Sequence, residues 1–269
     1  MIEANITDEE FALFRRLIYK IAGISLNDSK KVLLAGRLGK RLRQYGLKNF
    51  GDYYRMLASG DYPEELQTMV DLLTTNETYF FREPQHFEFL RSEVIAKRTI
   101  PAPLRVWSAA SSTGEEVYSI AMTLADAMPE KQWEVVGSDI CTRVLSKAVS
   151  GHYSLARTEG IPPGHMRKYC LKGVRSHEGT FLIDPELRRK TRFYQINLMN
   201  PVDNDIGDFE VIFLRNVMIY FDQETKARVV HNLLPRLKSG GHLIIGHSET
   251  LNGITSKVTS VRPTIYRKP

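Results

Sequence analysis

The stretch VIFLRNVMIYFD, residues Val211 to Asp222, joins an apolar run to a polar end. Val211 to Leu214 are all apolar, as in a strand buried at the centre of a sheet. Arg215 and Asn216 follow directly, although a core does not accept a guanidinium or an amide without partners. Ligands of open α/β sheets bind at the carboxyl ends of strands, so Arg215, Asn216 and the nearby Tyr220 form a candidate site. A locally satisfied strand-to-helix turn explains the same residues equally well.

On either side of this stretch, β-rich runs alternate with helical patterns, which predicts βαβ units in a parallel sheet. The expected strands are LRVWSAA (104–110), WEVVGSDI (133–140) and residues 191–196, 210–214 and 242–246. The expected helices cover residues 115–127, 142–149 and 223–237, and a last pair of β-like runs surrounds Pro263. A stretch rich in Gly, Pro and Arg interrupts the rhythm, so we expect an inserted subdomain at about residues 153–190.

The first 75 residues carry a helical pattern instead. Thr7 and Glu10 form a capping box ahead of apolar residues at helical spacing, which predicts a first helix. Further periodic segments cover residues 30–44, 50–58 and 63–73, with glycines between them. We therefore expect an all-helical domain at residues 1–75, a linker at residues 76–100 and an α/β domain at residues 101–269.

Length and composition are those of a globular protein. The 269 residues can bury a sizeable core, and 42% apolar and 25% charged residues are ordinary values. The acidic beginning MIEANITDEE does not follow the plan of a signal peptide, and no apolar run approaches the length of a membrane span. We therefore expect a cytoplasmic protein without membrane insertion.

Charge and cysteine content narrow the partners and cofactors. Cys141 and Cys170 supply neither a disulfide framework nor a metal cluster, so we expect no metal site. The net charge of +6 predicts an acidic partner, which could be nucleic acid, a membrane surface or an acidic protein.

The turn after the first expected strand, SSTGEE at residues 111–116, argues against a dinucleotide cofactor. It lacks the GxGxxG pattern, and two glutamates, Glu115 and Glu116, at the start of a helix would repel a pyrophosphate. A sulfonium cofactor carries no phosphates, and its positive centre tolerates acidic neighbours. The sequence therefore favours a phosphate-free cofactor.

Polar residues also follow the next two expected strands. Asp139 follows Gly114 by about the spacing at which an acidic residue binds the ribose diol of a nucleotide. Considered by itself, Asp139 is slightly better explained as a cap for the helix that starts at Thr142. Asn197 and Leu198 follow the third strand and give a weaker signal, because Asn is common in turns.

The segment NETYFFR, residues 76–82, joins the two halves and combines three aromatic rings with an amide, a hydroxyl and a guanidinium. Packing between domains explains its phenylalanines, and a surface position explains Arg82. Asn76, Thr78 and Arg82 are alternatively residues that bind a ligand.

Several motifs together resemble the CheR family of chemotaxis receptor methyltransferases: NETYFFR, VWSAASSTGEE, GSDI, INL, FLRNVMIYFD, and GHSE at residues 246–249. The resemblance covers essentially the whole chain. It implies a class I S-adenosylmethionine-dependent fold: a Rossmann-like doubly wound sheet with an antiparallel edge strand, preceded by a small all-α domain and carrying an inserted β-subdomain. It also implies that the protein methylates glutamate side chains on the cytoplasmic helices of chemoreceptors, with S-adenosylmethionine as cofactor and S-adenosylhomocysteine as product.

The resemblance assigns roles to individual residues. The cofactor contacts that it implies are Asn76, Thr78, Arg82, Glu116, Asp139, Asn197, Leu198, Arg215 and Asn216. Arg82 and Tyr220 resemble the pair nearest the transferred methyl group.

Two regions resemble parts that bind the receptor. A basic segment with Arg37, Lys40, Arg41 and Arg43 is similar to the helix that docks on the acidic methylation region, although such a run is usually a solvated face. The insertion resembles a β-subdomain that binds a receptor's carboxyl-terminal peptide in some members. Lys172 and Leu182 stand where peptide-binding members carry arginines, so this sequence departs from that pattern.

The implied chemistry needs no general base, because a free glutamate has a pKa of about 4.3 and is ionised near pH 7. We therefore do not predict a catalytic role for His86, His152, His231 or His247.

Three other functions explain part of the sequence. A nucleic-acid methyltransferase fits the basic charge, but LRNVMIYF stands where an NPPY-type motif is expected. A non-catalytic receptor adaptor would not be expected to keep every pocket residue. A dehydrogenase would need the glycines of the GxGxxG pattern, which the turn at residues 111–116 lacks.

Overall fold

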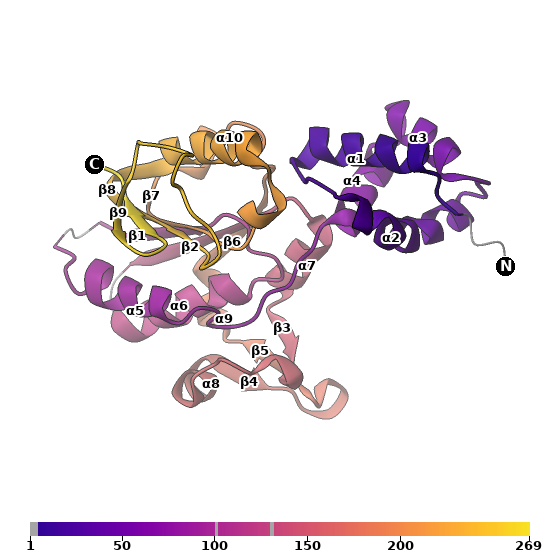
Figure 1. Cartoon of the computed structure of the whole chain (residues 1–269). Coiled ribbons are helices and arrows are strands. Elements are labelled where there is room, and N and C mark those ends of the chain that lie inside the picture. The colour runs from indigo at the N-terminus through magenta and orange to yellow at the C-terminus, as the bar shows by residue number, and fades with distance from the viewer. Residues whose placement is uncertain (1–4, 100–101, 130–131) are drawn as a thin grey trace.

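The computed structural model describes residues 5–99, 102–129 and 132–269. Figure 1 shows a helical domain, an α/β domain with a central sheet, and a small lobe that projects from it. Residues 1–4 of the predicted helical domain and the predicted domain boundary at residues 100 and 101 lie outside the described residues. Within the described ranges, we find no helix with the length and apolar character needed to cross a membrane.

Over residues 5–75, four α-helices build the helical domain: α1 (Asp8–Ala22), α2 (Lys31–Gln44), α3 (Phe50–Ala58) and α4 (Pro63–Leu73). α1 begins at the predicted capping box, in which Thr7 Oγ1 accepts from the Glu10 amide at 3.1 Å and the Thr7 amide donates to Glu10 Oε2 at 2.9 Å. It ends at Gly23, whose φ of 70° favours glycine. α2 starts one residue later than predicted, because Asp28–Lys30 form a separate 3-10 turn.

A seven-stranded sheet of order β6-β2-β1-β7-β8-β10-β9 forms the centre of the α/β domain. The neighbours from β6 to β8 pair in parallel, whereas β10 is antiparallel to β8, and β9 to β10. The strands are β1 Leu104–Ser108, β2 Trp133–Asp139, β6 Thr191–Gln195, β7 Phe209–Leu214, β8 Leu237–Ile245, β9 Thr259–Arg262 and β10 Ile265–Arg267. The predicted doubly wound sheet with an antiparallel edge is confirmed, and its strand order changes direction between β1 and β7.

From Val211 to Leu214, strand β7 is apolar and buried because both faces of the sheet are covered. Val211 and Phe213 belong to the core on one face, with α6 (Glu115–Ala127) and α5 (Gln85–Phe89). Ile212 and Leu214 belong to the core on the other face, with α10 (Gln223–Leu233). Successive strand residues point to opposite faces, so a strand buried on both sides shows no polar alternation.

Two predicted bounds are wrong at the junction of α10 and β8. The helix predicted to reach Leu237 ends at Leu233, and Leu234–Arg236 form a 3-10 turn. Pro235 has no amide hydrogen and cannot continue the helical hydrogen bonding. The strand predicted to begin at residue 242 begins at Leu237, where it pairs with Phe209 of β7.

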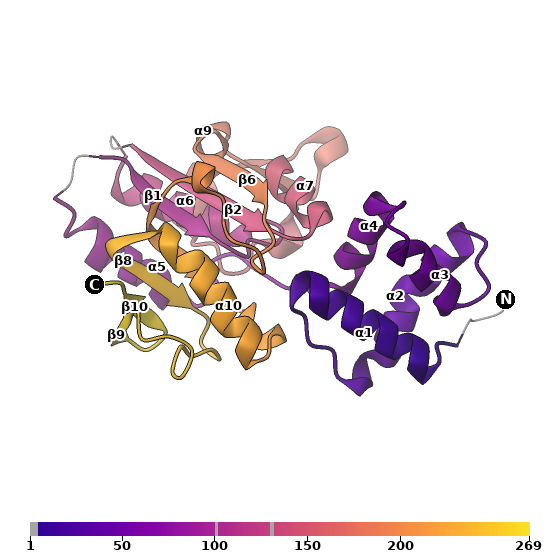
Figure 2. The same ribbon diagram turned by 90° about the horizontal axis from the view of Figure 1, so that it is seen from above.

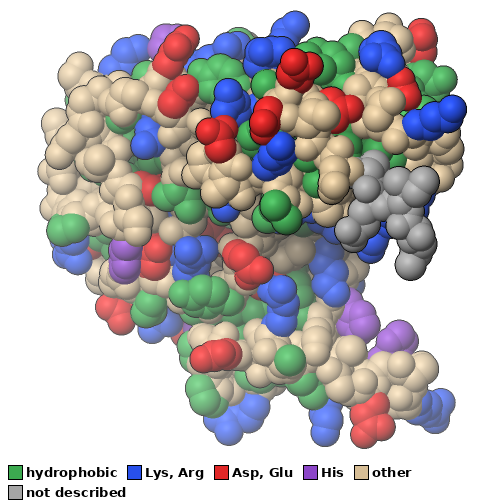
Figure 3. Space-filling view, turned by 45° about the vertical axis from the view of Figure 1, so that its right-hand side comes forward, with side chains coloured by type: hydrophobic (Ala, Val, Ile, Leu, Met, Phe, Trp, Pro, Cys, Tyr) green, Lys and Arg blue, Asp and Glu red, His purple; other side chains and the backbone are tan. Residues whose placement is uncertain are grey.

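The insertion forms the small lobe, a three-stranded antiparallel sheet of order β3-β5-β4. Its elements are β3 His152–Ser154, α8 Pro163–Tyr169, β4 Cys170–Lys172 and β5 Thr180–Ile183, and α9 Pro185–Arg189 leads back to β6. Phe80 of the linker packs against Tyr153 and Phe181, with ring centroids 5.1 and 5.9 Å away. In Figure 3 the lobe extends below the body of the molecule.

The helical domain lies against the α/β domain on the side of α10 (Figure 2). Tyr19 Oη donates to Asp222 Oδ2 at 2.8 Å, and the Ser25 amide donates to the Tyr220 carbonyl at 2.9 Å. Asn197 Nδ2 donates to the carbonyl of Ile21 at 2.6 Å. The two domains therefore meet directly beside the carboxyl ends of β6 and β7.

Candidate active site

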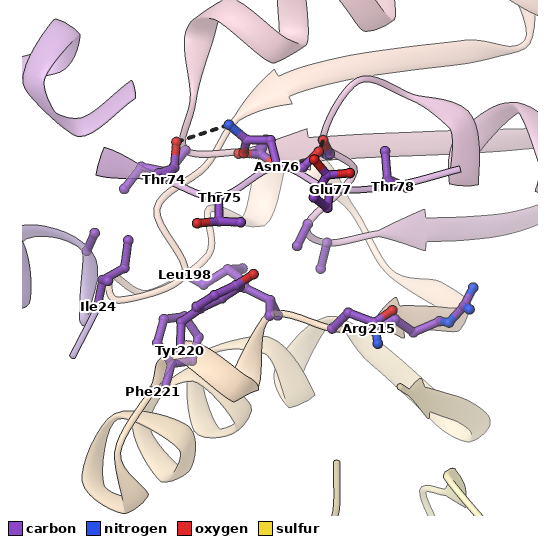
Figure 4. Close-up of a pocket in the computed structure, with 18 of the residues that line it drawn as sticks. Ile24, Thr74, Thr75, Asn76, Glu77, Thr78, Leu198, Arg215, Tyr220 and Phe221 are labelled. Atoms are coloured by element: carbon purple, nitrogen blue, oxygen red, sulfur yellow. Dashed lines mark hydrogen bonds between the residues drawn. The ribbon is translucent and has the colours of Figure 1, made fainter. Parts of the chain in front are cut away.

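A cavity with about 1360 Å³ of space, open solvent included, lies where the helical domain, the linker and the strand ends meet. Figure 4 shows linker residues Asn76 to Thr78 on one side and Leu198, Tyr220 and Arg215 across from them. All nine predicted cofactor contacts, and Tyr220, line this cavity. Arg37 is the member of the predicted docking set that also lines it, within the described residues.

Parallel pairing explains why residues distant in sequence meet here. The carboxyl ends of β1, β2, β6 and β7 lie at one edge of the sheet, which brings together Ser112, Asp139, Asn197 and Asn216. The turns after β1 and β7 are sharp, since Ser112 and Asn216 have φ values of 48° and 57°. Asn tolerates this left-handed conformation better than most residues.

Asp139 is buried at the end of β2. Its Oδ2 accepts from the Ser112 amide at 2.9 Å and its Oδ1 from the Cys141 amide at 3.0 Å. Burial raises the pKa of Asp139, and these amide donors act against that rise. The alternative role weighed for Asp139, a cap for the next helix, is filled by another residue.

That residue is Asp71, at the end of α4 in the helical domain. Its carboxylate accepts from the Thr142 amide at 3.1 Å, the Thr142 hydroxyl at 2.7 Å and the Arg143 amide at 3.0 Å. These groups lie in the first turn of α7 (Thr142–Ser150), whose own N-cap residue, Cys141, makes no side-chain cap. The sequence gives no sign of this role of Asp71, because a cap supplied from another domain leaves no local pattern.

Arg215 is held between two carboxylates. Its side chain is 1% exposed, and it contacts Glu116 Oε2 at 2.9 Å and Glu83 Oε2 at 3.1 Å. It also donates to the carbonyl of Arg82. Burial raises the pKa of Glu116, although the charge of Arg215 acts against this rise. Burial also acts to raise the pKa of Glu83, but the charge of Arg215 and several hydrogen bonds lower it overall. The guanidinium therefore fixes Glu116 and the linker in place.

Glu249 organises the turn between β7 and Tyr220. It accepts from the amides of Asn216 (2.9 Å), Met218 (2.8 Å) and Gly246 (2.7 Å). Glu83 and Glu249 are two site residues to which the sequence reasoning gave no role. Glu83 directly follows the NETYFFR motif, and Glu249 ends the GHSE motif, so both motifs carried a signal.

The linker wall is fixed mainly through its backbone. Ser112 Oγ donates to the Asn76 carbonyl at 2.8 Å, and the Phe81 amide donates to Ser119 Oγ at 2.9 Å. Arg82 is half-buried, with its guanidinium 5.6 Å from the Tyr79 ring centroid. Its Nη1 donates to the carbonyl of Glu77 at 3.3 Å. Arg82 therefore remains closer to solvent than Arg215.

The basic residues of α2 differ in their surroundings. Arg37 donates to the carbonyls of Leu72 and Thr74 at 3.1 and 3.0 Å. Arg41 forms a two-point ion pair with Glu65, a residue 4% exposed. Lys40 and Arg43 are exposed. Arg37 and Arg41 thus have structural contacts that charge reversal would break, and a docking test belongs on the other two.

Glu83, His86 and His247 bring possible metal-ligand atoms within 4.8 Å of one another. The Arg215 guanidinium contacts the same Glu83 oxygen at 3.1 Å, and its charge opposes a cation there. The expectation of no metal site remains a prediction.

The donor set of the cavity fits S-adenosylmethionine. Two carboxylates, Glu116 and Asp139, suit a cationic centre and a ribose diol. The first turn of α6 carries the acidic residue Glu115, whose charge would disfavour a phosphate at the backbone amides there.

Comparison with known proteins agrees with this geometry. The family model described as "CheR methyltransferase, SAM binding domain" matches residues 76–267, and "CheR methyltransferase, all-alpha domain" matches residues 9–74. A chemotaxis protein methyltransferase of Salmonella typhimurium is 41% identical over 263 residues, covering 97% of this chain and 90% of the relative. Chemotaxis protein methyltransferase 2 of Pseudomonas aeruginosa is 40% identical, covering 98% and 94%.

A more distant relative, the chemotaxis protein methyltransferase of Borreliella burgdorferi, is 33% identical and covers 99% of this chain and 96% of its own length. The resemblance stated from the motifs, and the cofactor that it implies, are therefore confirmed. The chain belongs to the CheR family of methyltransferases and is an S-adenosylmethionine-dependent enzyme of chemotaxis.

Proposed function

We propose that the protein methylates specific glutamate side chains on the cytoplasmic helices of chemoreceptors, forming methyl esters, and that it acts in the cytoplasm. The observation that carries this proposal is the composition of the cavity wall. Arg82 of the linker and Tyr220 after β7 both line a cavity whose described lining contains neither a histidine nor a cysteine. Such a wall suits an acceptor that is already ionised and needs orientation rather than a base.

The bound cofactor supplies a methyl group on a positively charged sulfur. We assign its ribose to Asp139, and its remaining polar groups to Glu116, Asn76, Thr78, Asn197, Asn216 and the backbone near Leu198. Arg215 contributes by holding Glu116 at 2.9 Å. When the cofactor and the acceptor fill this cavity, water is removed from the acceptor carboxylate, which raises its reactivity.

Arg82 and Tyr220 orient the acceptor. A guanidinium and a phenol can each donate to one oxygen of a carboxylate, which leaves the other oxygen free to attack. The Ser25 amide holds the Tyr220 carbonyl at 2.9 Å, so the helical domain helps to place this side chain.

Receptor contacts follow from the remaining surfaces. Lys40 and Arg43 offer exposed positive charge on α2 toward an acidic helix surface. In the small lobe, β4 is an edge strand with Leu171 48% exposed, where a receptor tail could add as a further strand. Lys172 retains one of the two positive charges expected for tail binding, and Leu182 does not, so we propose this contact only as an accessory one.

Labelled methyl transfer tests the reaction. The protein is incubated with labelled S-adenosylmethionine and a panel of receptor signalling domains, and each product is then treated with mild alkali. We expect receptor label that is released as methanol, because glutamyl esters hydrolyse and N-methyl groups do not. Alkali-stable label on nucleic acid, with none on any receptor domain, would contradict the proposal.

The Tyr220→Phe variant tests the orientation of the acceptor. Loss of a hydrogen bond to a charged group should lower kcat about tenfold to a hundredfold. Calorimetric affinity for S-adenosylhomocysteine should stay unchanged, because the ring is retained. Full turnover in this variant would remove Tyr220 from the mechanism.

A further inference from the structure

One residue of the small lobe reaches the wall of the cofactor cavity. Arg157 ends the 3-10 turn Leu155–Arg157 that follows β3. Its Nη1 donates to the carbonyl of Thr78 at 3.0 Å and to Glu115 Oε1 at 2.8 Å. A single guanidinium nitrogen thus links the lobe, the linker and the start of α6.

Glu115 depends on this arginine for charge compensation. Its side chain is 0% exposed, and Arg157 is the cation that pairs with it among the described residues. Its other oxygen accepts from Thr113 Oγ1 at 2.6 Å. Burial raises the pKa of Glu115, and Arg157 acts against that rise. A buried carboxylate that loses its cation is strongly unfavourable, so the pair resists separation.

The lobe holds the same part of the linker at two further points. The Phe80 ring packs edge-on against Tyr153, at 5.1 Å between centroids. Gly160 lies so close to the Phe80 carbonyl that a Cβ there would stand 2.3 Å from its oxygen. The lobe therefore contacts the linker at both the side chain and the backbone of Phe80.

We propose that Arg157 is a positioning residue of the cofactor site, and that the inserted lobe serves cofactor binding by holding the linker wall at Thr78. This inference rests on the proposed place of Asn76 and Thr78 beside the cofactor. It assigns the lobe a role that is independent of any receptor peptide.

The test is the affinity of the full-length protein for S-adenosylhomocysteine, measured by calorimetry without any receptor. We expect Arg157→Ala to weaken binding about tenfold, because a charge-assisted contact to the wall is lost. The matched control is Arg167→Ala on α8, an exposed arginine of the same lobe with no ion pair within the described residues. It should bind as tightly as the wild type.

A second variant separates positioning from stability. In Arg157→Ala with Glu115→Gln, no uncompensated buried charge remains, so the midpoint of thermal unfolding should return toward the wild-type value. The affinity should recover only in part, because the Thr78 carbonyl still lacks its donor. Wild-type affinity in either variant would overturn the inference while the proposed function stands. No binding by the wild type would overturn both.

A pH titration gives a further readout. In Arg157→Ala the pKa of Glu115 should rise further, so lowering the pH should neutralise this carboxyl and recover part of the lost affinity. The Arg157→Lys variant should keep part of the wild-type affinity at neutral pH, since Lys supplies a charge but no planar fork. A loss of affinity that is equal at every pH would speak against the Glu115 contact.

Discussion

One wall of the cavity, the strand-end wall, consists of residues that follow the strands of the sheet, and the linker wall, residues 76–82, faces it. The two walls are built in different ways. The strand-end wall contains buried charges in fixed pairs, with Arg215 1% exposed between Glu116 and Glu83. The linker wall is fixed through its backbone, and its guanidinium, that of Arg82, is half-buried beside Tyr79. Rigid buried groups suit a cofactor that is the same in every turnover, and accessible groups suit an acceptor that arrives on another protein. Substitutions in the two walls should therefore have different consequences.

Arg215→Met should have the largest effect. Two carboxylates, Glu83 and Glu116, lose their shared cation, and breaking a buried pair in this way costs about 3–5 kcal/mol. The free energy of unfolding in urea measures the loss. Arg228→Met, an exposed position on α10, is the control and should change it by less than about 0.5 kcal/mol. Equal stability of the two variants would break the comparison.

Arg82→Ala should show the opposite pattern in the linker wall. We expect kcat/KM for receptor methylation to fall at least about tenfold, since the donor to the acceptor carboxylate is lost. The free energy of unfolding should stay within about 0.5 kcal/mol of the wild type, because Arg82 has no buried partner charge among the described residues. A stability loss as large as that of Arg215→Met would show that the walls do not differ.

The pH dependence of stability should reveal His86, which lies behind the strand-end wall. Burial first, and the charge of Arg215 second, lower the pKa of His86 from 6.5 to about 4. Because the unfolded histidine binds a proton more readily, its contribution is present above pH 6.5 and is lost as the pH falls toward 4. The loss between pH 7 and pH 5 should be about 2 kcal/mol.

His86→Gln should flatten that dependence in urea unfolding at pH 7 and pH 5. His247→Gln is the matched control, because His247 lies 5.3 Å from His86 between ring centroids but is exposed. Identical slopes for His86→Gln and the wild type would show that His86 is not the group responsible.

Charge reversal on α2 should have the smallest effect. Lys40→Glu with Arg43→Glu should lower kcat/KM for a receptor by about threefold to tenfold at low salt, because encounter slows. The difference should shrink as salt is added, and affinity for S-adenosylhomocysteine should not change. Arg167→Glu on the small lobe is the control. A salt dependence equal to that of the wild type would refute a docking role for these two residues.

The sequence predicted those features that depend on local patterns. The apolar run of β7 and the polar residues after it predicted a buried strand with a site at its end, and parallel pairing brings that end beside β1. The bounds of α3, α4 and α6 follow from apolar spacing and from Gly or Pro at their ends. Family motifs supplied the individual site residues that composition alone could not.

Interactions between distant segments could not be predicted in this way. The cap that Asp71 provides for α7 joins residues more than 70 positions apart, and the contact of Arg157 with Thr78 joins a lobe to a linker. The surroundings of Arg37 and Arg41 were equally hidden, because a basic run looks the same whether its charges are free or paired. Such contacts require coordinates.

The hydrogen bonds that Glu249 accepts from three backbone amides have a consequence for synthesis on the ribosome. The turn that carries Tyr220 is fixed by a carboxylate that follows Asn216 by 33 residues. A nascent chain that has just exposed β7 therefore has the turn but not the group that holds it. The reaction centre can form only after β8 and the GHSE segment have emerged, so ribosome-bound intermediates shorter than this should be inactive even when their helical domain is folded.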